Sequence, residues 1–140
     1  MSNINELVLE AVESRNKKFI IHLHRADRVG LHYDIRLEKD NKLKSWACRK
    51  IPDLIDNKTK KILIIQQPDH KMDWFDFKGE ITDGYGKGKV EIWDKGIYDT
   101  IKWEKNSIVV VFKGTKIKGS YAMIPYKKKN WLMFRSKEQP

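Results

Sequence analysis

The sequence has one cysteine, no long apolar run and no internal repeat. Cys48 has no partner for a disulfide within the chain, and the lack of a second cysteine excludes a zinc knuckle. Nowhere do about 18 consecutive apolar residues occur, and the first residues lack the basic start and apolar run of a signal peptide. We therefore expect a cytoplasmic protein with no membrane partner.

Acidic residues are scarce relative to basic ones. The 140 residues include 29 Lys and Arg against 19 Asp and Glu, which gives a formal net charge of +10. This excess favours a polyanionic partner such as nucleic acid. Five Trp, five Tyr and five Phe supply bulky core material, so we expect the chain to fold as one domain with a proper core.

Hydrophobic periodicity divides the chain into a short helical segment and a β domain. Apolar residues at helical spacing between Ile4 and Val12 predict a helix, and we assign residues 1–17 to an N-terminal helical segment. Runs rich in branched and aromatic residues then predict strands. These runs are residues 19–24, 31–37, 43–48, 62–65, 89–93, 108–112, 119–124 and 130–135. With a hairpin turn at Asp40-Asn41, so many short strands indicate a barrel or sandwich over residues 18–136.

One predicted strand carries a polar face that needs an explanation. Alternation along residues 31–37 places His32, Asp34 and Arg36 together, opposite an apolar face. Arg36 would lie within reach of an anionic group bound beside Asp34, and its planar guanidinium group can donate two hydrogen bonds to a phosphate. A water-facing strand with an ion pair between Asp34 and Arg36 is the simpler interpretation, and it stays open.

The preceding strand adds two more histidines. His22 and His24 share one face of residues 19–24, so two adjacent strands could bring two imidazoles and the Asp34 carboxylate to one point. Such a ligand set suits Mn, Fe, Zn or Ni and leaves coordination positions open for water and substrate. A catalytic metal site is favoured over a structural one.

Other candidate residues carry weaker signals. His70 lies in Pro68–Lys71, a predicted polar turn in which a histidine can face a pocket mouth. Lys50 follows a predicted strand, and Trp74 is either a core edge or a base-stacking platform. The glycine-containing stretch 83–88 is interpreted as a tight connection between strands rather than a nucleotide cradle.

Taken together, these pieces resemble the 3′-phosphoesterase domain family of bacterial DNA ligase D and its free-standing homologues. The matching stretches are residues 19–24, 31–38, 43–47, 69–70, 77–79, 85–88, 92–94 and 131–133. The resemblance implies a mainly β fold, a small closed or partly closed antiparallel β-barrel. It also implies a Mn²⁺-dependent enzyme, with other divalent transition metals as alternatives. In this family a terminal 3′ ribonucleotide is removed first, and the remaining 3′-phosphate is hydrolysed to a 3′-hydroxyl.

The resemblance also implies residue roles and partners. The implied metal ligands are His24, His32 and Asp34. The residues implied around the scissile phosphate are Arg36, Lys50 and His70, as catalytic and substrate-binding groups, and Trp74 as a further substrate contact. Expected partners are DNA or RNA-tailed DNA 3′ ends, with a DNA ligase and a polymerase acting in trans during end joining.

The sequence departs from the family pattern in places that matter for function. The connection from His24 to His32 is longer than in the family, which leaves His22 as an alternative first ligand. Trp74 stands where the family usually has a tyrosine. No counterpart of the family's N-terminal segment, which is tied to ribonucleotide removal, occurs between Asn3 and Lys18. The phosphomonoesterase step is therefore predicted more firmly than the phosphodiesterase step.

Two further functions stay open. His32 and Asp34 form the H-x-D half of the facial triad of iron(II)/2-oxoglutarate oxygenases, in which His70 would be the distal histidine. That motif is short and often occurs by chance. A non-catalytic DNA-binding module would use the positive charge and the Trp residues alone, and it would keep its DNA affinity after metal chelation.

Overall fold

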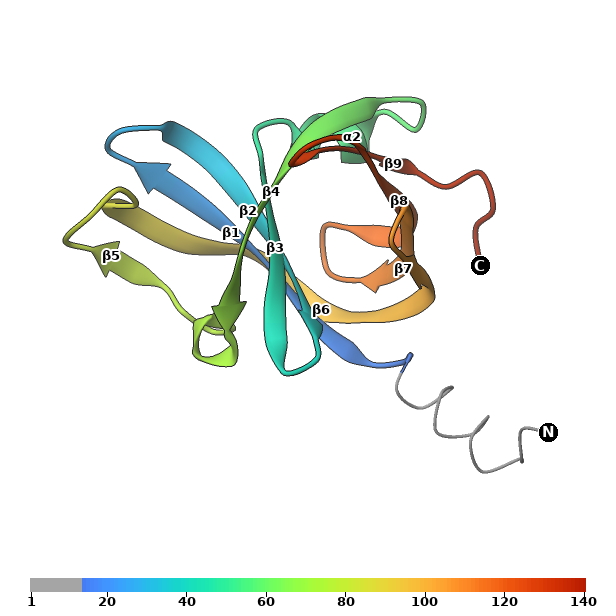
Figure 1. Ribbon diagram of the computed structural model, residues 1–140, viewed down its shortest axis with the longest axis horizontal. Helices are drawn as coiled ribbons and strands as arrows, with labels where there is room; N and C mark the ends of the chain where they lie inside the picture. Colours follow the sequence, from blue (N-terminus) through green and yellow to red (C-terminus); the bar gives the residue numbers. More distant parts are fainter. Residues whose placement is uncertain (1–13) are drawn as a thin grey trace.

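The computed structural model describes residues 14–140, which form one antiparallel β-sheet that closes on itself (Figure 1). The sheet order is β1-β2-β3-β4-β9-β8-β7-β6-β5, and an additional pairing of β1 with β6 closes an eight-stranded barrel with β5 as an extra strand. The strands are β1 (Lys17–Ala26), β2 (Gly30–Lys39), β3 (Lys42–Cys48), β4 (Lys61–Lys71), β5 (Gly79–Ile81), β6 (Gly88–Glu104), β7 (Ser107–Lys113), β8 (Lys118–Lys127) and β9 (Asn130–Arg135). The predicted mainly β barrel is confirmed.

Helical structure is a minor part of the described chain. A short helix, α2 (Ile51–Asp56), and a 3-10 turn, η1 (Met72–Trp74), interrupt the strands. Between residues 14 and 140, no helix has the length and apolar character needed to cross a membrane. The predicted N-terminal helix around Ile4–Val12 lies outside the described residues, and Lys17, which was assigned to that segment, is the first residue of β1.

The local sequence signals explain most strand boundaries. Every predicted strand run lies inside an observed strand. At the β2–β3 turn, Asp40 and Asn41 have φ values of 53° and 62°, the left-handed backbone that a two-residue hairpin turn requires. Lys39 and Lys42 pair across this turn, so the predicted hairpin is confirmed.

Alternate residues of the strands fill the barrel interior. Phe19 and Ile35 come from neighbouring strands, and Trp46 and Met133 from strands on either side of β4. Ile51 and Leu54 of α2 join the same buried cluster. Side chains that alternate with these residues therefore lie on the outer face of the barrel wall.

The long strand β6 pairs with different strands along its length. Its first half pairs with β1 and its second half with β7, while β5 pairs only with its first residues. In Figure 1, the β1–β2 hairpin and the β5–β6 hairpin project together from one side of the barrel. Gly88 allows this close pairing, because a Cβ at this position would lie 2.1 Å from the Arg25 carbonyl oxygen. The stretch 83–88 is thus a connection between strands, as predicted.

The predicted polar turn at Pro68–Lys71 is wrong, since these residues continue β4. Ser45 pairs with Gln67 and Leu43 pairs with His70, so β4 has two residues opposite Lys44 alone. This bulge accommodates Pro68, whose nitrogen cannot donate a ladder hydrogen bond. It also returns His70 to the outer face of the wall, where the site described below lies.

Candidate active site

The polar side chains that the sequence singled out on β1 and β2 lie on the outer face of the barrel, yet all but the half-buried His32 are buried. The strand register aligns His22 with Asp34 and His24 with His32. His22 has no exposed surface, and Asp34 and Arg36 are only 7% and 5% exposed. The simpler interpretation of a water-facing strand is therefore wrong, because the chain that follows β4 covers part of this face.

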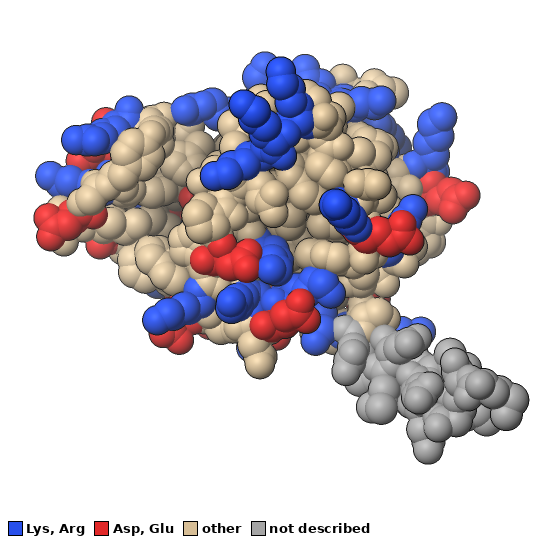
Figure 2. Space-filling model, in the orientation of Figure 1, with Lys and Arg blue, Asp and Glu red and all other residues tan. Residues whose placement is uncertain are grey.

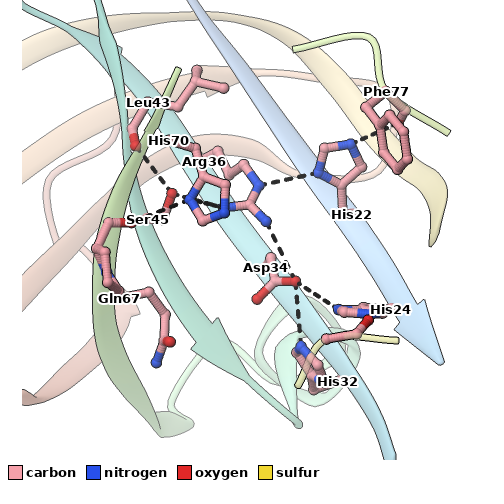
Figure 3. Close-up of polar contacts among 12 residues, drawn as sticks. His22, His24, His32, Asp34, Arg36, Leu43, Ser45, Gln67, His70 and Phe77 are labelled. Atoms are coloured by element: carbon pink, nitrogen blue, oxygen red, sulfur yellow. Dashed lines mark hydrogen bonds and ion pairs between the residues drawn. The ribbon is translucent and has the colours of Figure 1, made fainter. Parts of the chain in front are cut away.

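Two imidazoles and one carboxylate meet at a single point (Figure 3). Their candidate ligand atoms, one each from His24, His32 and Asp34, all lie within 4.8 Å of one another. His24 Nδ1 lies 3.5 Å and His32 Nε2 lies 3.3 Å from the same oxygen, Asp34 Oδ2. The three predicted ligands are thus brought together from two adjacent strands.

Backbone carbonyls fix the orientation of both rings. The Nε2 of His24 lies 2.7 Å from the Gly86 carbonyl oxygen, and the Nδ1 of His32 lies 3.2 Å from the Gly30 carbonyl oxygen. A carbonyl only accepts, so each of these nitrogens carries the proton. The other nitrogen of each ring then faces Asp34 and donates to its carboxylate; toward a cation bound at this point, the same nitrogen, once deprotonated, would present its lone pair. Outer hydrogen bonds of this kind are typical of histidines that bind metal ions.

The electrostatics of the cluster favour an ionised carboxylate. Burial opposes the charge on Asp34, but hydrogen bonds from His24 and His32 and the charge of Arg36 outweigh it. The pKa of Asp34 is consequently held well below its usual range. The hydrogen bond to Asp34 also raises the pKa of His32. A buried negative charge between two imidazoles is an arrangement that suits a cation.

Arg36 is the cationic centre of the site and has contacts along its whole guanidinium group. Its Nη2 lies 3.6 Å from Asp34 Oδ2, so the ion pair considered from the sequence exists. Its Nη1 donates to Ser45 Oγ at 2.9 Å and to His70 Nδ1 at 3.0 Å. Its Nε donates to His22 Nδ1 at 3.2 Å. These contacts place a fixed positive charge directly beside the cluster of His24, His32 and Asp34.

His22 supports Arg36 and does not belong to the candidate ligand cluster. Its Nε2 donates to the Phe77 carbonyl oxygen at 2.8 Å, and its Nδ1 accepts from Arg36. Both ring nitrogens are therefore occupied, which argues against His22 as the alternative first ligand. Burial, together with the charge of Arg36, lowers the pKa of His22 to about 4, so this ring is neutral.

His70 and Trp74 form one wall of the site. Because a guanidinium group can only donate, the contact with Arg36 requires an unprotonated Nδ1 on His70 and places the proton on Nε2. The Pro68 carbonyl oxygen, 3.1 Å from the same Nδ1, would favour the opposite tautomer. Burial and the nearby Arg36 lower the pKa of His70 and favour the neutral ring. The Trp74 ring packs edge-on against His70, and Arg36 Cζ lies over the Trp74 ring, 5.8 Å from its centroid.

These residues line one cavity of about 870 Å³. It contains all of the predicted site residues: His24, His32, Asp34, Arg36, Lys50, His70 and Trp74. The exposed Lys50 reaches it from the N-terminal end of α2. His70 contacts Arg36 and is not among the three clustered ligands, so the His32, Asp34 and His70 triad that the oxygenase alternative predicted is not assembled.

The cavity also has lining residues that the sequence did not single out. They are Arg49, Lys60, Lys61, Leu63, Ile65, Gln67 and Tyr85, among others. The positive charge of Arg49, Lys60 and Lys61 was visible in the sequence, but their position was not. Leu63 and Ile65 belong to an unbroken apolar run, in which alternation cannot distinguish the core face from the outer face.

Comparisons with known proteins show which family this chain is similar to. Residues 22–125 match the family model described as the DNA ligase D 3′-phosphoesterase domain. The chain is 39% identical over 136 residues to the multifunctional non-homologous end joining protein LigD of Mycolicibacterium smegmatis, covering 89% of this chain and 17% of that protein. It is 42% identical over 126 residues to the corresponding DNA repair protein of Mycobacterium tuberculosis, covering 86% of this chain and 16% of the relative. It is 35% identical over 131 residues to LigD of Pseudomonas aeruginosa, with 86% and 15% covered. The chain therefore spans about a sixth of the length of these relatives.

Proposed function

The chain belongs to the DNA ligase D 3′-phosphoesterase domain family, and from that premise we propose that it is a metal-dependent phosphoesterase that converts DNA 3′-phosphates to 3′-hydroxyls. The observation that carries the proposal is the convergence of His24, His32 and Asp34 beside the buried Arg36. The relatives are named for non-homologous end joining, which supports a role in preparing broken DNA ends for sealing.

The donor set fits a divalent transition metal, and we propose Mn²⁺. His24 Nδ1, His32 Nε2 and a carboxylate oxygen of Asp34 would hold the ion, and three protein ligands leave positions for substrate oxygen or water. When bound, the ion supplies Lewis-acid polarisation of a phosphoryl oxygen. The carbonyls of Gly86 and Gly30 keep both imidazoles in the tautomer that this role requires.

Arg36 and Lys50 are proposed to bind the phosphate. Water attacks phosphorus, the bond from phosphorus to O3′ breaks, and O3′ takes up a proton as it leaves. Charge increases on the phosphoryl oxygens during this step, and the fixed guanidinium group of Arg36 offsets it without moving. Lys50 is exposed at the cavity rim, so it can approach the phosphate from the solvent side.

His70 is proposed to donate a hydrogen bond from its Nε2–H to the phosphate or to the leaving O3′. Because the ring is neutral, it keeps this proton, and O3′ takes up the proton that the attacking water releases. The contact between its Nδ1 and Arg36 fixes the side of the ring that faces the substrate. Trp74 holds His70 by edge-on packing, with ring centroids 5.3 Å apart, and closes this wall of the cavity. An indole has no hydroxyl at this position, so its contribution is packing and substrate contact rather than proton transfer.

Removal of a terminal ribonucleotide is the finer part of the proposal. A phosphodiester would occupy the same phosphate position, with the terminal ribonucleoside attached to phosphorus through its O5′. Water attacks phosphorus, the bond from phosphorus to this O5′ breaks, O5′ takes up a proton, and the 3′-phosphate stays on the DNA. The cavity of about 870 Å³ has room for a nucleoside beside the phosphate. Partners under this proposal are DNA 3′ ends and, in trans, a DNA ligase and a polymerase.

The test uses labelled primer–template strands that end in a 3′-phosphate or in one ribonucleotide, with and without Mn²⁺. We expect Mn²⁺-dependent formation of a 3′-hydroxyl by the wild-type protein and at least a hundredfold slower formation by the His32→Ala and His70→Ala variants. Lys95→Ala removes an exposed ion pair with Asp76 and is the matched control, with wild-type rates expected. Equal rates for wild type and His32→Ala would contradict the ligand assignment. DNA binding that survives chelation, without any phosphate release, would instead favour the non-catalytic binding module.

A further inference from the structure

The cavity continues past the catalytic residues along the outer face of β4. Leu63 and Ile65 point outward there, and they remain 47% and 39% exposed. Ile65 pairs with Ala47 of β3, which lines the same cavity. We call these three residues, Ala47, Leu63 and Ile65, the β4 strip. Two exposed branched side chains in a catalytic cavity are a contact surface that the phosphate chemistry does not require.

Positive charge flanks the β4 strip. Lys60 and Lys61 lie at its far end and line the same cavity, and Arg49 and Lys50 line it from the start of α2. Within the described part of the chain, Asp34 is the sole carboxylate among the lining residues. Figure 2 shows lysines and arginines gathered where β4 begins and α2 lies, above a central area without acidic side chains. A partner that is apolar in part and carries several negative charges fits this surface.

We propose that the β4 strip binds the unpaired nucleotides immediately 5′ of the scissile phosphate. The inference rests on the proposed function, because it places the phosphate at Arg36. From Gln67, beside the site, to Leu63 the strand spans about 13 Å at the usual rise per residue. A few nucleotides cover that distance. Their bases would contact Leu63 and Ile65, and their phosphates would contact Lys60 and Lys61.

The surface favours an unpaired strand over a duplex and over a protein partner. In a duplex the base faces are stacked on one another and cannot reach aliphatic side chains, whereas an unpaired strand exposes them. Tyr85 also lines the cavity and is 66% exposed, which offers an aromatic ring to another base. A protein partner would have to enter the catalytic cavity itself and would need acidic groups opposite the cations.

The experiment compares a long with a minimal substrate. The long substrate is a single-stranded oligothymidylate of about a dozen nucleotides with a 3′-phosphate, and the minimal one is thymidine 3′-monophosphate. In the Leu63→Thr/Ile65→Thr double variant, which keeps good strand formers, we expect KM for the long substrate to rise about tenfold, as for the loss of one base contact. KM for the minimal substrate and both kcat values should stay unchanged. Ile101→Thr, at a 60% exposed strand position outside the cavity, is the matched control.

Binding measured without hydrolysis separates this inference from the proposed function. Fluorescence anisotropy with a 5′-labelled single strand that ends in a 3′-hydroxyl should give about tenfold weaker affinity for the double variant. The same strand in a blunt duplex should bind wild type more weakly and show little effect of the variant. If the protein released no phosphate but the anisotropy difference persisted, only the proposed function would fail. Unchanged single-strand affinity in the double variant would overturn the inference. If the double variant instead lost binding to a purified DNA ligase, the β4 strip would be a protein-docking surface.

Discussion

At the scale of single residues, Arg36 links the two halves of the site. Its guanidinium group contacts Asp34 on one side and Ser45 and His70 on the other. The Nδ1 of His22 accepts a hydrogen bond from the Nε of Arg36. A buried arginine with this many partners has little rotamer freedom left, so its charge is already in place before substrate arrives. Four strands contribute to this arrangement, which makes Arg36 sensitive to changes in residues that never contact the phosphate.

His22 is the clearest such positioning residue. Its replacement by alanine removes the acceptor of Arg36 Nε and the donor to the Phe77 carbonyl oxygen. We expect His22→Ala to lower kcat by about ten- to a hundredfold, the equivalent of one hydrogen bond to a charged group. His22→Gln can keep an acceptor and a donor and should recover most of the rate. Steady-state kinetics on a 3′-phosphate substrate would measure both.

The two variants also separate positioning from stability. Thermal unfolding should show that both His22 variants remain folded at the assay temperature, and Mn²⁺ affinity should be close to wild type. If His22→Ala lost metal affinity rather than kcat, His22 would belong to the metal site, contrary to the geometry.

The sequence predicted the residues that alternate along one strand and the approach of a second strand with two histidines, but it did not decide which of these histidines joins the cluster. His32, Asp34 and Arg36 share a face through the two-residue period alone. The choice between His22 and His24 required the Gly86 and Phe77 carbonyls, which come from more than 50 positions further along the chain. No local pattern contains that information.

At the scale of elements, the junction between β3 and α2 stabilises the β1–β2 turn. Arg49 donates to the Leu31 carbonyl at 2.8 Å and to the Val29 carbonyl at 2.7 Å. Gly30, between these residues, provides the carbonyl that orients His32. Arg49 therefore fixes the geometry of a proposed metal ligand from a different element.

Replacing Arg49 should weaken metal binding. We expect Arg49→Ala to reduce Mn²⁺ affinity by about tenfold, in the range seen when outer hydrogen bonds of a metal site are removed. Isothermal titration calorimetry with Mn²⁺ would measure it. Arg25→Ala removes an equal charge from an exposed pair with Glu91 and should bind Mn²⁺ as wild type does. Equal affinities for the two variants would show that the turn holds its shape without Arg49.

Asp94 performs a structural role in the second half of the barrel. Its carboxylate is 4% exposed and accepts backbone N–H groups of Lys95, Thr115, Lys116 and Ile117, which fixes the β7–β8 turn. We expect Asp94→Ala to lower the free energy of unfolding by about 3 kcal/mol, because buried donors lose a charged acceptor. Chemical denaturation would measure this loss. Asp76→Ala, in an exposed pair with Lys95, should change stability by about 0.5 kcal/mol at most. A small effect of Asp94→Ala would contradict the assignment.

Strands were more predictable than the elements between them. The barrel strands were recognisable because each has several branched or aromatic residues between turn signals. α2 is too short to show a helical period, although Pro52 near its start is a typical helix-start signal. β5 has three residues and depends on pairing with β6, and the bulge that carries Pro68 into β4 depends on pairing with β3. Those features are set by tertiary contacts rather than by local sequence.

At the scale of the whole molecule, the net charge of +10 acts together with the position of the cavity. A basic surface attracts nucleic acid of any sequence and releases its counterions on binding. Under the proposed function, the positively charged cavity then accepts a strand end but not the side of a duplex. This division assigns general affinity to the surface and end selection to the site.

The salt dependence of DNA binding should reflect the few lysines at the cavity. If Lys50, Lys60 and Lys61 each contact one phosphate of a single strand, the affinity should fall about twentyfold between roughly 50 and 200 mM salt. The Lys60→Ala/Lys61→Ala variant should show a smaller fall, with the slope reduced by about 1.4. Anisotropy titrations at several salt concentrations would measure both slopes. An unchanged slope would place the DNA elsewhere on the surface.

The central claim is that two imidazoles and one carboxylate hold a single divalent ion beside Arg36. Electron paramagnetic resonance of Mn²⁺ added to the protein tests it most directly. We expect one ion bound per chain, with nitrogen couplings from two histidine rings that disappear when His24 and His32 are replaced by alanine. A spectrum of free aqueous Mn²⁺ with the wild-type protein, or bound Mn²⁺ without nitrogen couplings, would contradict the account.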